Sequence, residues 1–410
     1  MTVLNILLVS EDIPHPKMGG LGKHAITLGN ALIASGHRVD LFGNNYYPYE
    51  QMAGDVIFKG NFYPKLNIKN GQWKEKQLGF FNYYRRAFLA YRFARAILAV
   101  RNRYDVIHYH GHLPILANFI PKHVNFVQTR HDQGSDCLTH TRFKHGAVCY
   151  EINPTVCSSC ATENPNTLQR ALSKANVIKW RTAVKQAFQR HKVIFVSHFL
   201  QDNLVRTLGS VEEGNVDVVY NFTDTRQIAM ALEETSSDHA EPDIFIAARV
   251  DLAKGVGAFL EAMKENLPEG RNVTVAGDGP DLESLRQHFN GRWVKFLGWT
   301  SYKEVIRLTV RAKIVVVPSV CEESCATSIL EALALGQRVL ALKRGGTPEL
   351  IMYQRYPGQL QLHNTLESMV HALKVIHKNE FRLAFDNNFK GGVEHMLPKI
   401  LNIYRRNRVS

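Results

Sequence analysis

The sequence has no long hydrophobic run, and its N-terminus lacks the marks of an export signal. A membrane-spanning helix needs about 20 consecutive apolar residues, and no such run occurs in the 410 residues. The first ten residues carry no basic segment and no small-residue cleavage site, so they predict a buried first strand. We therefore expect a protein that stays in the cytoplasm. Short internal repeats and low-complexity tracts are absent as well.

Acidic side chains are scarce relative to basic ones, with 37 Asp and Glu against 50 Lys and Arg. The stretch 77–104 holds six Arg and no acid, and the stretch 164–201 holds seven Lys or Arg and no acid. Such a balance favours anionic partners, namely phosphorylated substrates, anionic lipid or nucleic acid. No nucleic-acid-binding motif is present, so nucleic acid is not expected as a partner.

Cysteines are few, but four of the six are crowded together. The last two form a C-x-x-C pair, which is half of a structural zinc site. We predict that the four hold a structural zinc ion that orders the polar loop 133–166, with His140 or His145 able to replace one ligand. The alternative is free thiols in a reducing cytoplasm. The four cysteines are Cys137, Cys149, Cys157 and Cys160.

Short runs rich in Val and Ile alternate with longer helical patterns along the chain. The runs are apolar on both faces, which is typical of parallel sheets covered by helices. A polar, acidic stretch at 223–243 interrupts the alternation, which then restarts. We predict an α/β fold of two Rossmann-like doubly wound domains facing a cleft. The predicted parts are an N-terminal acceptor-side domain at 1–222, a nucleotide-sugar-binding domain at 223–390, and a C-terminal helix at 391–410 that packs back toward the first domain.

The first expected strand, Leu4–Ser10, leads into a glycine-rich turn that contains Gly19 and Gly20. Glycines at a strand-to-helix turn let the backbone approach a phosphate, and the helix N-terminus adds N–H donors. We interpret the turn as a pyrophosphate contact. The alternative is a tight turn that needs glycine for its own geometry, because the spacing is not the G-x-G-x-x-G of dinucleotide folds.

Two cations follow the first expected strand of the second domain. Arg249 closes that strand, and Lys254 opens the next helix. Both would lie at the mouth of the cleft, where two cations can neutralise a departing diphosphate. The alternative is an ordinary surface Arg and Lys.

The most informative segment follows an apolar strand that ends at Pro318. Its loop carries Glu323, and a helix expected to start near Cys325 carries Glu331, eight residues further on. Glu331 stands among apolar neighbours, which is unusual for a solvated helix residue. A carboxylate can accept hydrogen bonds from sugar hydroxyls, and free N–H groups at a helix start can hold phosphate oxygens. The expected donors are Ser324, Cys325, Ala326, Thr327 and Ser328.

Taken in order, these motifs resemble glycosyltransferase family 4, whose members are retaining enzymes of the GT-B architecture. The resemblance covers nearly the whole chain, and the order and spacing of the motifs make it specific. Besides the segments above, it rests on Asp105–Gly111, Thr129–Asp132, Val196–Ser197, Tyr220–Asp224, Gly277–Pro280 and Phe296–Trp299.

The resemblance implies roles for four residues of the second domain. Glu323 would bind donor sugar hydroxyls near the reacting carbon, and Glu331 would bind the nucleotide ribose. Arg249 and Lys254 would stabilise the departing diphosphate, an electrostatic effect that requires no metal or other cofactor for catalysis. The family's Gly-Phe-Gly-like segment is Ser324–Ala326 here, so this segment does not identify the donor.

In the first domain, the resemblance implies that Gly19 and Gly20 lie beside the diphosphate and that His131 lies at the sugar end. Spacing favours Glu323 over its neighbour Glu322 as the sugar-binding carboxylate. The expected activity is retaining transfer from a nucleoside-diphosphate sugar, most commonly UDP, to a glycan or lipid-linked acceptor of bacterial surface polysaccharide or lipopolysaccharide. The alternatives are a GDP-sugar (mannosyl-type) transferase, a sugar-nucleotide epimerase or phosphorylase, and a non-catalytic basic surface-binding protein.

The segment Phe80–Arg86 mixes aromatic residues with Arg, a combination suited to an anionic lipid surface. We predict peripheral contact with the inner face of the cell membrane. In the alternative interpretation, the segment begins an ordinary helix that turns Phe88, Phe93 and Ile97 inward and its Arg side chains outward.

Overall fold

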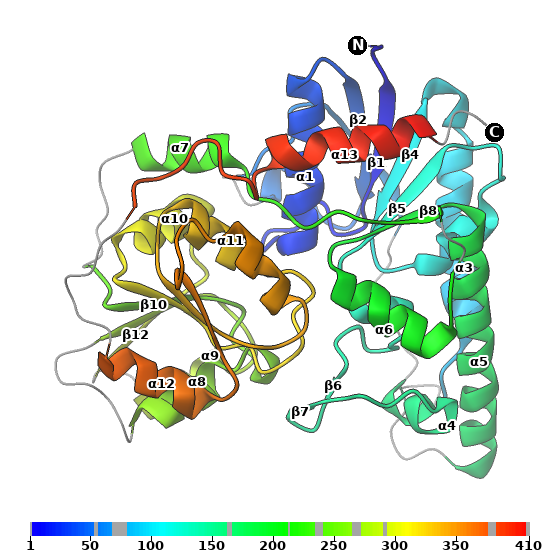
Figure 1. The fold of residues 1–410 in the computed structure, drawn as a ribbon. Helices are drawn as coiled ribbons and strands as arrows, with labels where there is room; N and C mark the ends of the chain where they lie inside the picture. The colour runs from blue at the N-terminus through cyan, green and yellow to red at the C-terminus, as the bar shows by residue number, and fades with distance from the viewer. Residues whose placement is uncertain are drawn as a thin grey trace. The chain divides into compact units, whose positions relative to one another are not determined.

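The protein, seen in a computed structural model, consists of two compact units (Figure 1). The N-terminal unit comprises Met1–Arg142, Cys149–Tyr220 and Glu394–Ser410, and the C-terminal unit comprises Phe143–Val148 and Asn221–Val393. None of the helices in the described part of the chain is long and apolar enough to cross a membrane. The described residues are 2–52, 56–67, 80–161, 166–211, 214–233, 241–264, 272–289, 293–375 and 383–406.

A parallel sheet forms the centre of the N-terminal unit. Its seven strands, counted over the described residues, run in the order β3-β2-β1-β4-β5-β8-β9. The central strands are apolar and buried on both faces, as in β1, where Leu7, Leu8 and Val9 expose no surface. The strands are β1 (Asn5–Val9), β2 (Arg38–Asn44), β3 (Asn61–Leu66), β4 (Val106–His110), β5 (Phe126–Arg130), β8 (Lys192–Phe195) and β9 (Val216–Val218).

The helices of this unit include one from the end of the chain, α13, which carries Tyr404. The Tyr404 hydroxyl lies 2.7 Å from Nδ1 of His108 on β4, and the Asn125 side chain donates to the Tyr404 carbonyl at 2.9 Å. These contacts join the C-terminal helix to the central strands of the sheet. The helices are α1 (Gly20–Ala34), α3 (Tyr83–Leu98), α4 (Pro154–Cys157), α5 (Thr167–Arg190), α6 (His198–Leu208) and α13 (Val393–Arg406).

The C-terminal unit repeats this design with six parallel strands, again counted over the described residues, in the order β12-β11-β10-β13-β14-β15. The strands are β10 (Ile244–Ala247), β11 (Val273–Ala276), β12 (Val294–Gly298), β13 (Ile314–Val317), β14 (Val339–Leu342) and β15 (Leu360–His363). The helices are α7 (Thr225–Glu233), α8 (Val256–Lys264), α9 (Leu282–Phe289), α10 (Tyr302–Arg311), α11 (Thr327–Ala334) and α12 (Leu366–Val375).

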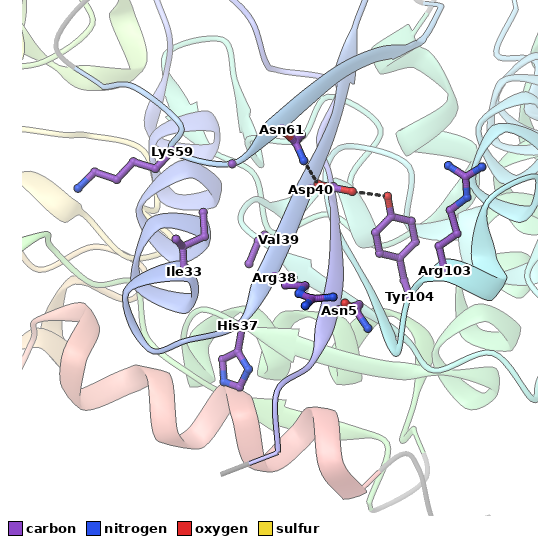
Figure 2. A pocket seen from close by; sticks show the side chains of 11 residues that line it. Asn5, Ile33, His37, Arg38, Val39, Asp40, Lys59, Asn61, Arg103 and Tyr104 are labelled. Carbon is purple, nitrogen blue, oxygen red and sulfur yellow. Dashed lines mark hydrogen bonds between the residues drawn. The ribbon is translucent and has the colours of Figure 1, made fainter.

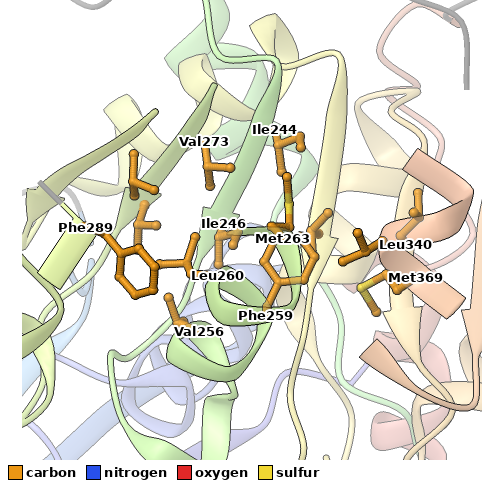
Figure 3. Packing of buried hydrophobic residues seen from close by; sticks show 14 of the residues in the cluster. Ile244, Ile246, Val256, Phe259, Leu260, Met263, Val273, Phe289, Leu340 and Met369 are labelled. Carbon is orange, nitrogen blue, oxygen red and sulfur yellow. The ribbon is translucent and has the colours of Figure 1, made fainter. Parts of the chain in front are cut away.

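Helix α8 shows why this unit folds as a layer of helices on a sheet. Its buried residues Val256, Phe259, Leu260 and Met263 recur at helical spacing and form one apolar stripe. Figure 3 shows this stripe packed with β10 and β11 residues and with Met369 of α12. Burial of the stripe fixes α8 on the sheet, and with it the loop that precedes the helix.

The predicted α/β alternation is confirmed, and three features differ from expectation. The edge strands β3 and β15 were not expected, and the polar stretch at 223–243 contains α7. Residues 234–240 of that stretch lie outside the described part. A hairpin of β6 (Phe143–Lys144) and β7 (Ala147–Val148) turns at His145 and Gly146, both with positive φ. Contacts group this hairpin with the C-terminal unit, whereas the sequence-based division keeps it in the N-terminal domain.

Strand order locates one switch point in each sheet. The chain leaves β1 to one side and β4 lies on the other, and β10 and β13 have the same relation in the C-terminal unit. In open α/β sheets, ligands bind beyond the carboxyl ends of the strands at such a point. The motifs singled out in the sequence follow the ends of these four strands and β5.

Candidate functional site

In the C-terminal unit, the loops after β10 and β13 meet through an ion pair. Lys254 Nζ lies 2.5 Å from Glu323 Oε1, and the Ser319 hydroxyl donates to the same oxygen at 2.5 Å. Gly255 has φ +68°, and a Cβ there would lie only 2.2 Å from the Pro318 carbonyl oxygen. Glycine is therefore needed for the two loops to approach closely enough to form the pair.

Both members of the pair are charged at neutral pH. Burial alone would lower the pKa of Lys254, but the Glu323 carboxylate outweighs burial and raises it. Burial would likewise raise the pKa of Glu323, and Lys254 and Ser319 lower it instead. The contact with Lys254 supports Glu323, rather than Glu322, as the carboxylate of this site.

Arg249 and Lys254 are linked through Asp251. The Asp251 carboxylate accepts from the Lys254 backbone N–H at 2.9 Å and lies 3.2 Å from Arg249 Nε. The Arg249 side chain is 69% exposed, so it remains accessible to a ligand. The loop after β10 thus offers one held and one exposed cation at the carboxyl end of the sheet.

Helix α11 begins at Thr327, two residues later than expected, and no side chain caps its first turn. Cys325 is buried, and its carbonyl accepts from the Asn221 side chain at 2.8 Å. Burial raises the pKa of Cys325 to about 12, so its thiol stays protonated at neutral pH. The first N–H groups of α11, including those of Thr327 and Ser328, form the kind of end that binds phosphate oxygens.

The two carboxylates of the Glu-x7-Glu segment have different partners. Glu331 is 7% exposed, in the middle of α11. Burial and then the Glu331 carboxylate raise the pKa of Tyr302 well above its ordinary value, which places these two side chains together. Glu323 is instead held by Lys254.

In the N-terminal unit, Gly19 and Gly20 begin α1. Gly19 has φ −83°, and neither glycine is in the left-handed region. A Cβ added to either residue would meet no atom within 4 Å. Backbone strain and internal packing therefore do not account for glycine at these positions, which leaves the pyrophosphate interpretation as the physical reason for it.

His131 follows β5 and belongs to a group of buried imidazoles. His131 Nε2 lies 3.1 Å from Nδ1 of His110, and the His24 ring centroid lies 4.5 Å from that of His131. Burial lowers the pKa of His24 to about 3 and that of His110 and His131 well below the ordinary value. All three rings are neutral at pH 7, so His131 can accept or donate a hydrogen bond without carrying charge.

A neighbouring network was not predicted from the sequence. His112 Nδ1 lies 2.8 Å from Asp132, and His112 Nε2 lies 3.2 Å from Asp12. Burial opposes the charged ring, but the two carboxylates raise the pKa of His112 well above its ordinary value. These residues follow β4, β5 and β1, and that shared position at strand ends was the available signal.

The cysteine loop is ordered mainly by polar contacts. The four cysteines predicted to bind zinc are half-buried thiols. Cys157 lies near Cys137 and Cys149, but across the described residues the cysteines form no group of three with sulfurs within 4.8 Å. The zinc site stays a prediction. The predicted ligands are Cys137, Cys149, Cys157 and Cys160.

A cavity of about 440 Å³ lies at the other edge of the N-terminal sheet (Figure 2). Its lining includes Asn5, Arg38 and Asn61, which stand at the amino ends of β1, β2 and β3. Asp40 accepts from the Tyr104 hydroxyl at 2.7 Å and from Asn61 at 3.0 Å. The cavity is thus on the side of the sheet away from the strand ends where nucleotides bind.

Comparisons with known proteins cover both units. The family model described as Glycosyltransferase Family 4 matches residues 18–227, and that described as Glycosyl transferases group 1 matches residues 231–390. A phosphatidylinositol N-acetylglucosaminyltransferase of Arabidopsis thaliana is 30% identical over 85% of this chain and 69% of its own length.

Solved structures support the fold. Sucrose-phosphate synthase of Thermosynechococcus elongatus is similar over 98% of both chains, with a TM-score of 0.65 and 19% identity. Anabaena HepE in complex with UDP-glucose is similar over 98% of both chains, with a TM-score of 0.58 and 16% identity. These likenesses confirm the predicted GT-B fold of two Rossmann-like domains.

Proposed function

The chain belongs to glycosyltransferase family 4, and on that premise we propose that it transfers a sugar from a UDP-sugar to a lipid-linked or glycan acceptor with retention of configuration. It is a glycosyltransferase with a GT-B fold. The contact of Lys254 with Glu323 at the switch point of the second sheet carries the proposal. HepE, whose structure contains UDP-glucose, supports UDP as the base. The lipid named for the Arabidopsis relative supports a lipid acceptor.

In the proposed reaction, the bond between the anomeric carbon and the diphosphate oxygen breaks as the acceptor oxygen attacks from the same face. The acceptor proton passes to the departing diphosphate. Lys254, Arg249 and the first turn of α11 stabilise the negative charge that develops on that diphosphate. Glu323 holds the donor sugar, and Glu331 holds the ribose. Gly19 and Gly20 contact the diphosphate, and His131 contacts the sugar.

A panel of nucleotides tests the donor. We expect UDP and UDP-sugars to raise the thermal midpoint of unfolding, because a ligand that binds only the folded state stabilises it by about 2.7 kcal/mol at 100 times Kd. GDP, ADP and TDP sugars are expected to give smaller shifts. Equal shifts with GDP-sugars would favour a mannosyl-type transferase. No shift with any nucleotide-sugar would contradict the proposed function.

Gly20→Ala separates ligand binding from folding. The added Cβ meets open space, so we expect stability to be unchanged or to rise by up to about 1 kcal/mol. UDP-sugar affinity should fall at least about tenfold, because the methyl group keeps the backbone away from the diphosphate. Thermal unfolding and calorimetric titration measure the two effects.

Gly29→Ala, in the same helix, is the matched control. Its Cβ would lie 2.6 Å from the Phe58 ring, so it should destabilise the fold by about 1–3 kcal/mol through overpacking. Its effect on affinity should be small once the folded fraction is corrected. If Gly20→Ala bound UDP-sugar as tightly as the wild type, the assignment of Gly19 and Gly20 to the diphosphate would be wrong.

We propose that the outer face of α3 and α5 docks on an anionic membrane at the inner face of the cell. In α3, Tyr84, Phe88 and Tyr91 are exposed, and Lys179 of α5 donates to the Tyr84 hydroxyl at 2.6 Å. Neither helix contains an acidic residue, so basic and aromatic groups share one surface without opposing charge.

The structure refines both sequence-based interpretations of this region. Phe81 and Arg86, which lie in the segment predicted to meet lipid, are buried, with the Arg86 guanidinium 4.9 Å from the Phe81 ring centroid. Phe88, which the ordinary-helix alternative turns inward, is 63% exposed. The proposed membrane face therefore begins at Tyr84.

Vesicle flotation tests the membrane face. We expect the protein to float with phosphatidylcholine vesicles that contain about 30% phosphatidylglycerol, and to bind pure phosphatidylcholine poorly. Arg92→Glu with Lys174→Glu should lower binding about tenfold or more, since each basic residue near the surface contributes about 1 kcal/mol. Arg286→Glu, on α9 of the other unit, is the control and should bind as the wild type does. Equal binding by the double variant would contradict the assignment.

A further inference from the structure

Three histidines meet at the carboxyl ends of the central strands of the N-terminal unit. His110 is the last residue of β4, His131 follows the last residue of β5, and His24 lies in the second turn of α1. Strands β4 and β5 are neighbours in the sheet, and α1 follows the switch-point strand β1. Three elements separated in sequence thus direct imidazoles to one point.

We propose that His24, His110 and His131 form a binding site for a divalent first-row transition-metal ion of the Zn²⁺ class. One nitrogen from each ring lies within 4.8 Å of the other two, and His110 Nδ1 and His131 Nε2 are 3.1 Å apart. Tetrahedral zinc with Zn–N bonds of about 2.0–2.1 Å places its nitrogen ligands about 3.4 Å apart. Small side-chain rotations therefore bring the set to ligand geometry.

The state of the rings suits a metal. Metal ions bind neutral imidazole, so protons compete with them at ordinary histidine sites near pH 6.5. Burial lowers the pKa of all three histidines, which removes that competition at neutral pH. Imidazole ligands favour zinc, copper, nickel and cobalt over magnesium and calcium.

One buried atom points to a missing partner. His110 exposes no surface, and its Nε2 makes no hydrogen bond with the described residues. Buried polar atoms are nearly always paired, so such an atom is expected where an ion or water binds. The neighbouring His108 differs, because its two ring nitrogens lie 2.7 Å from Thr129 and from Tyr404. His108 therefore supports the site without being a ligand.

The second cluster of this unit is a weaker metal site. His112, Asp132 and His140 also have ligand atoms within 4.8 Å of one another. Their contacts are already made, because Asp132 lies 2.8 Å from His112 and 3.1 Å from His140, and His112 also contacts Asp12. A metal would have to replace these hydrogen bonds, whereas the three-histidine site loses only one.

The proposed site has room for a fourth ligand. His131 is half-buried, while His24 and His110 are buried, so the open side of the cluster is at His131. Three protein ligands with an open position is the arrangement of metal sites that bind water or a substrate atom. The proposal concerns ion binding by these residues and does not depend on transferase activity.

Titration with Co²⁺ and Zn²⁺ tests the site in the full-length protein. We expect one Co²⁺ bound with visible ligand-field bands typical of nitrogen ligands, and Zn²⁺ should displace it. In His24→Gln/His110→Gln, these bands should disappear, and calorimetric Zn²⁺ affinity at the site should fall at least about 100-fold. His140→Gln and His288→Gln are controls, and both should bind as the wild type does.

Two measurements keep the test decisive. Circular dichroism in EDTA checks that the double variant is folded, and His131→Gln, at the half-buried position, replaces it if it is not. The sulfur-to-cobalt charge-transfer band reports separately on the predicted cysteine site. Cobalt bands and zinc affinity that survive substitution of the three histidines would overturn the proposal, as would a protein whose only bound cobalt shows the sulfur band.

Discussion

Lys254→Ala is expected to lower kcat for sugar transfer by about 10²–10³-fold, the loss typical of removing one donor to a developing oxyanion. The Lys254 ammonium lies at the carboxyl end of β10, and its contact with Glu323 keeps it charged. Without that charge, the departing diphosphate loses its held cation, and Arg249 is too exposed to replace it fully. Steady-state kinetics with a UDP-sugar donor measure the effect.

Lys264→Ala is the matched control for this variant, because Lys264 is a 46% exposed lysine of α8 in the same unit. Its kcat should equal that of the wild type. Lys254→Arg keeps the charge but changes the shape of the contact with Glu323, so an intermediate kcat is expected. Wild-type kcat in Lys254→Ala would remove Lys254 from the proposed mechanism.

The same variant should show a pH-dependent loss of stability. Lys254 lowers the pKa of Glu323 below its ordinary value of 4.5, so the pair stabilises the fold above about pH 4.5. This contribution disappears as pH falls through the lowered pKa of Glu323. The free energy of unfolding should therefore differ between wild type and variant by about 1–3 kcal/mol at pH 7, and the difference should vanish in acid. Urea denaturation at several pH values measures it.

Asp136→Ala is expected to destabilise the cysteine loop by about 3–5 kcal/mol, because it leaves a buried guanidinium without its carboxylate. The side chains of Arg142 and Asp136 are only 2% and 3% exposed. Arg142 Nε donates to Asp136 at 2.9 Å, and its other nitrogens reach the Thr207 hydroxyl at 2.6 Å and the Glu151 carbonyl at 3.3 Å. Hydrogen exchange of the loop amides and urea denaturation measure the loss.

Two variants define what this result means. Arg286→Ala removes one side of an exposed pair with Glu283 and should change stability by less than about 0.5 kcal/mol. Asp136→Ala combined with Arg142→Leu removes both charges and should recover part of the lost stability. If Asp136→Ala were as mild as Arg286→Ala, the ion pair would not be what orders the loop.

The cysteine loop also shows where sequence reasoning reached its limit. Its polar composition predicted a metal staple, since few apolar residues were available to order it. In the structure, Arg142 connects Asp136, Thr207 and Glu151, although nothing in the sequence distinguishes it from a surface arginine. The ordering contact depends on a partner on α6, more than 60 residues away.

The buried strands could be predicted because both of their faces are apolar. Strand β13 is Ile-Val-Val-Val with every residue buried, and such a run is hard to mistake. Strand β3 is an edge strand with exposed positions and contains Pro64, so its pattern is weak. Strand β15 also lies at an edge and is only partly buried.

The candidate site divides in the same way. Lys254 and Glu323 stand in motifs whose order along the chain is informative, and the structure brings them into contact. Asp12 and His112 are 100 residues apart, and only strand order brings them together. Parallel sheets collect loop residues from distant segments, so pairings of this kind become visible only when the topology is known.

The return of α13 to the first sheet affects how the protein can be made. During synthesis, Val106–His110 leaves the ribosome nearly 300 residues before Tyr404, whose hydroxyl contacts His108. Domains usually complete their folding as they emerge, but this one must wait for the last segment of the chain. A premature stop codon near position 390 would therefore damage the half of the protein that was translated first.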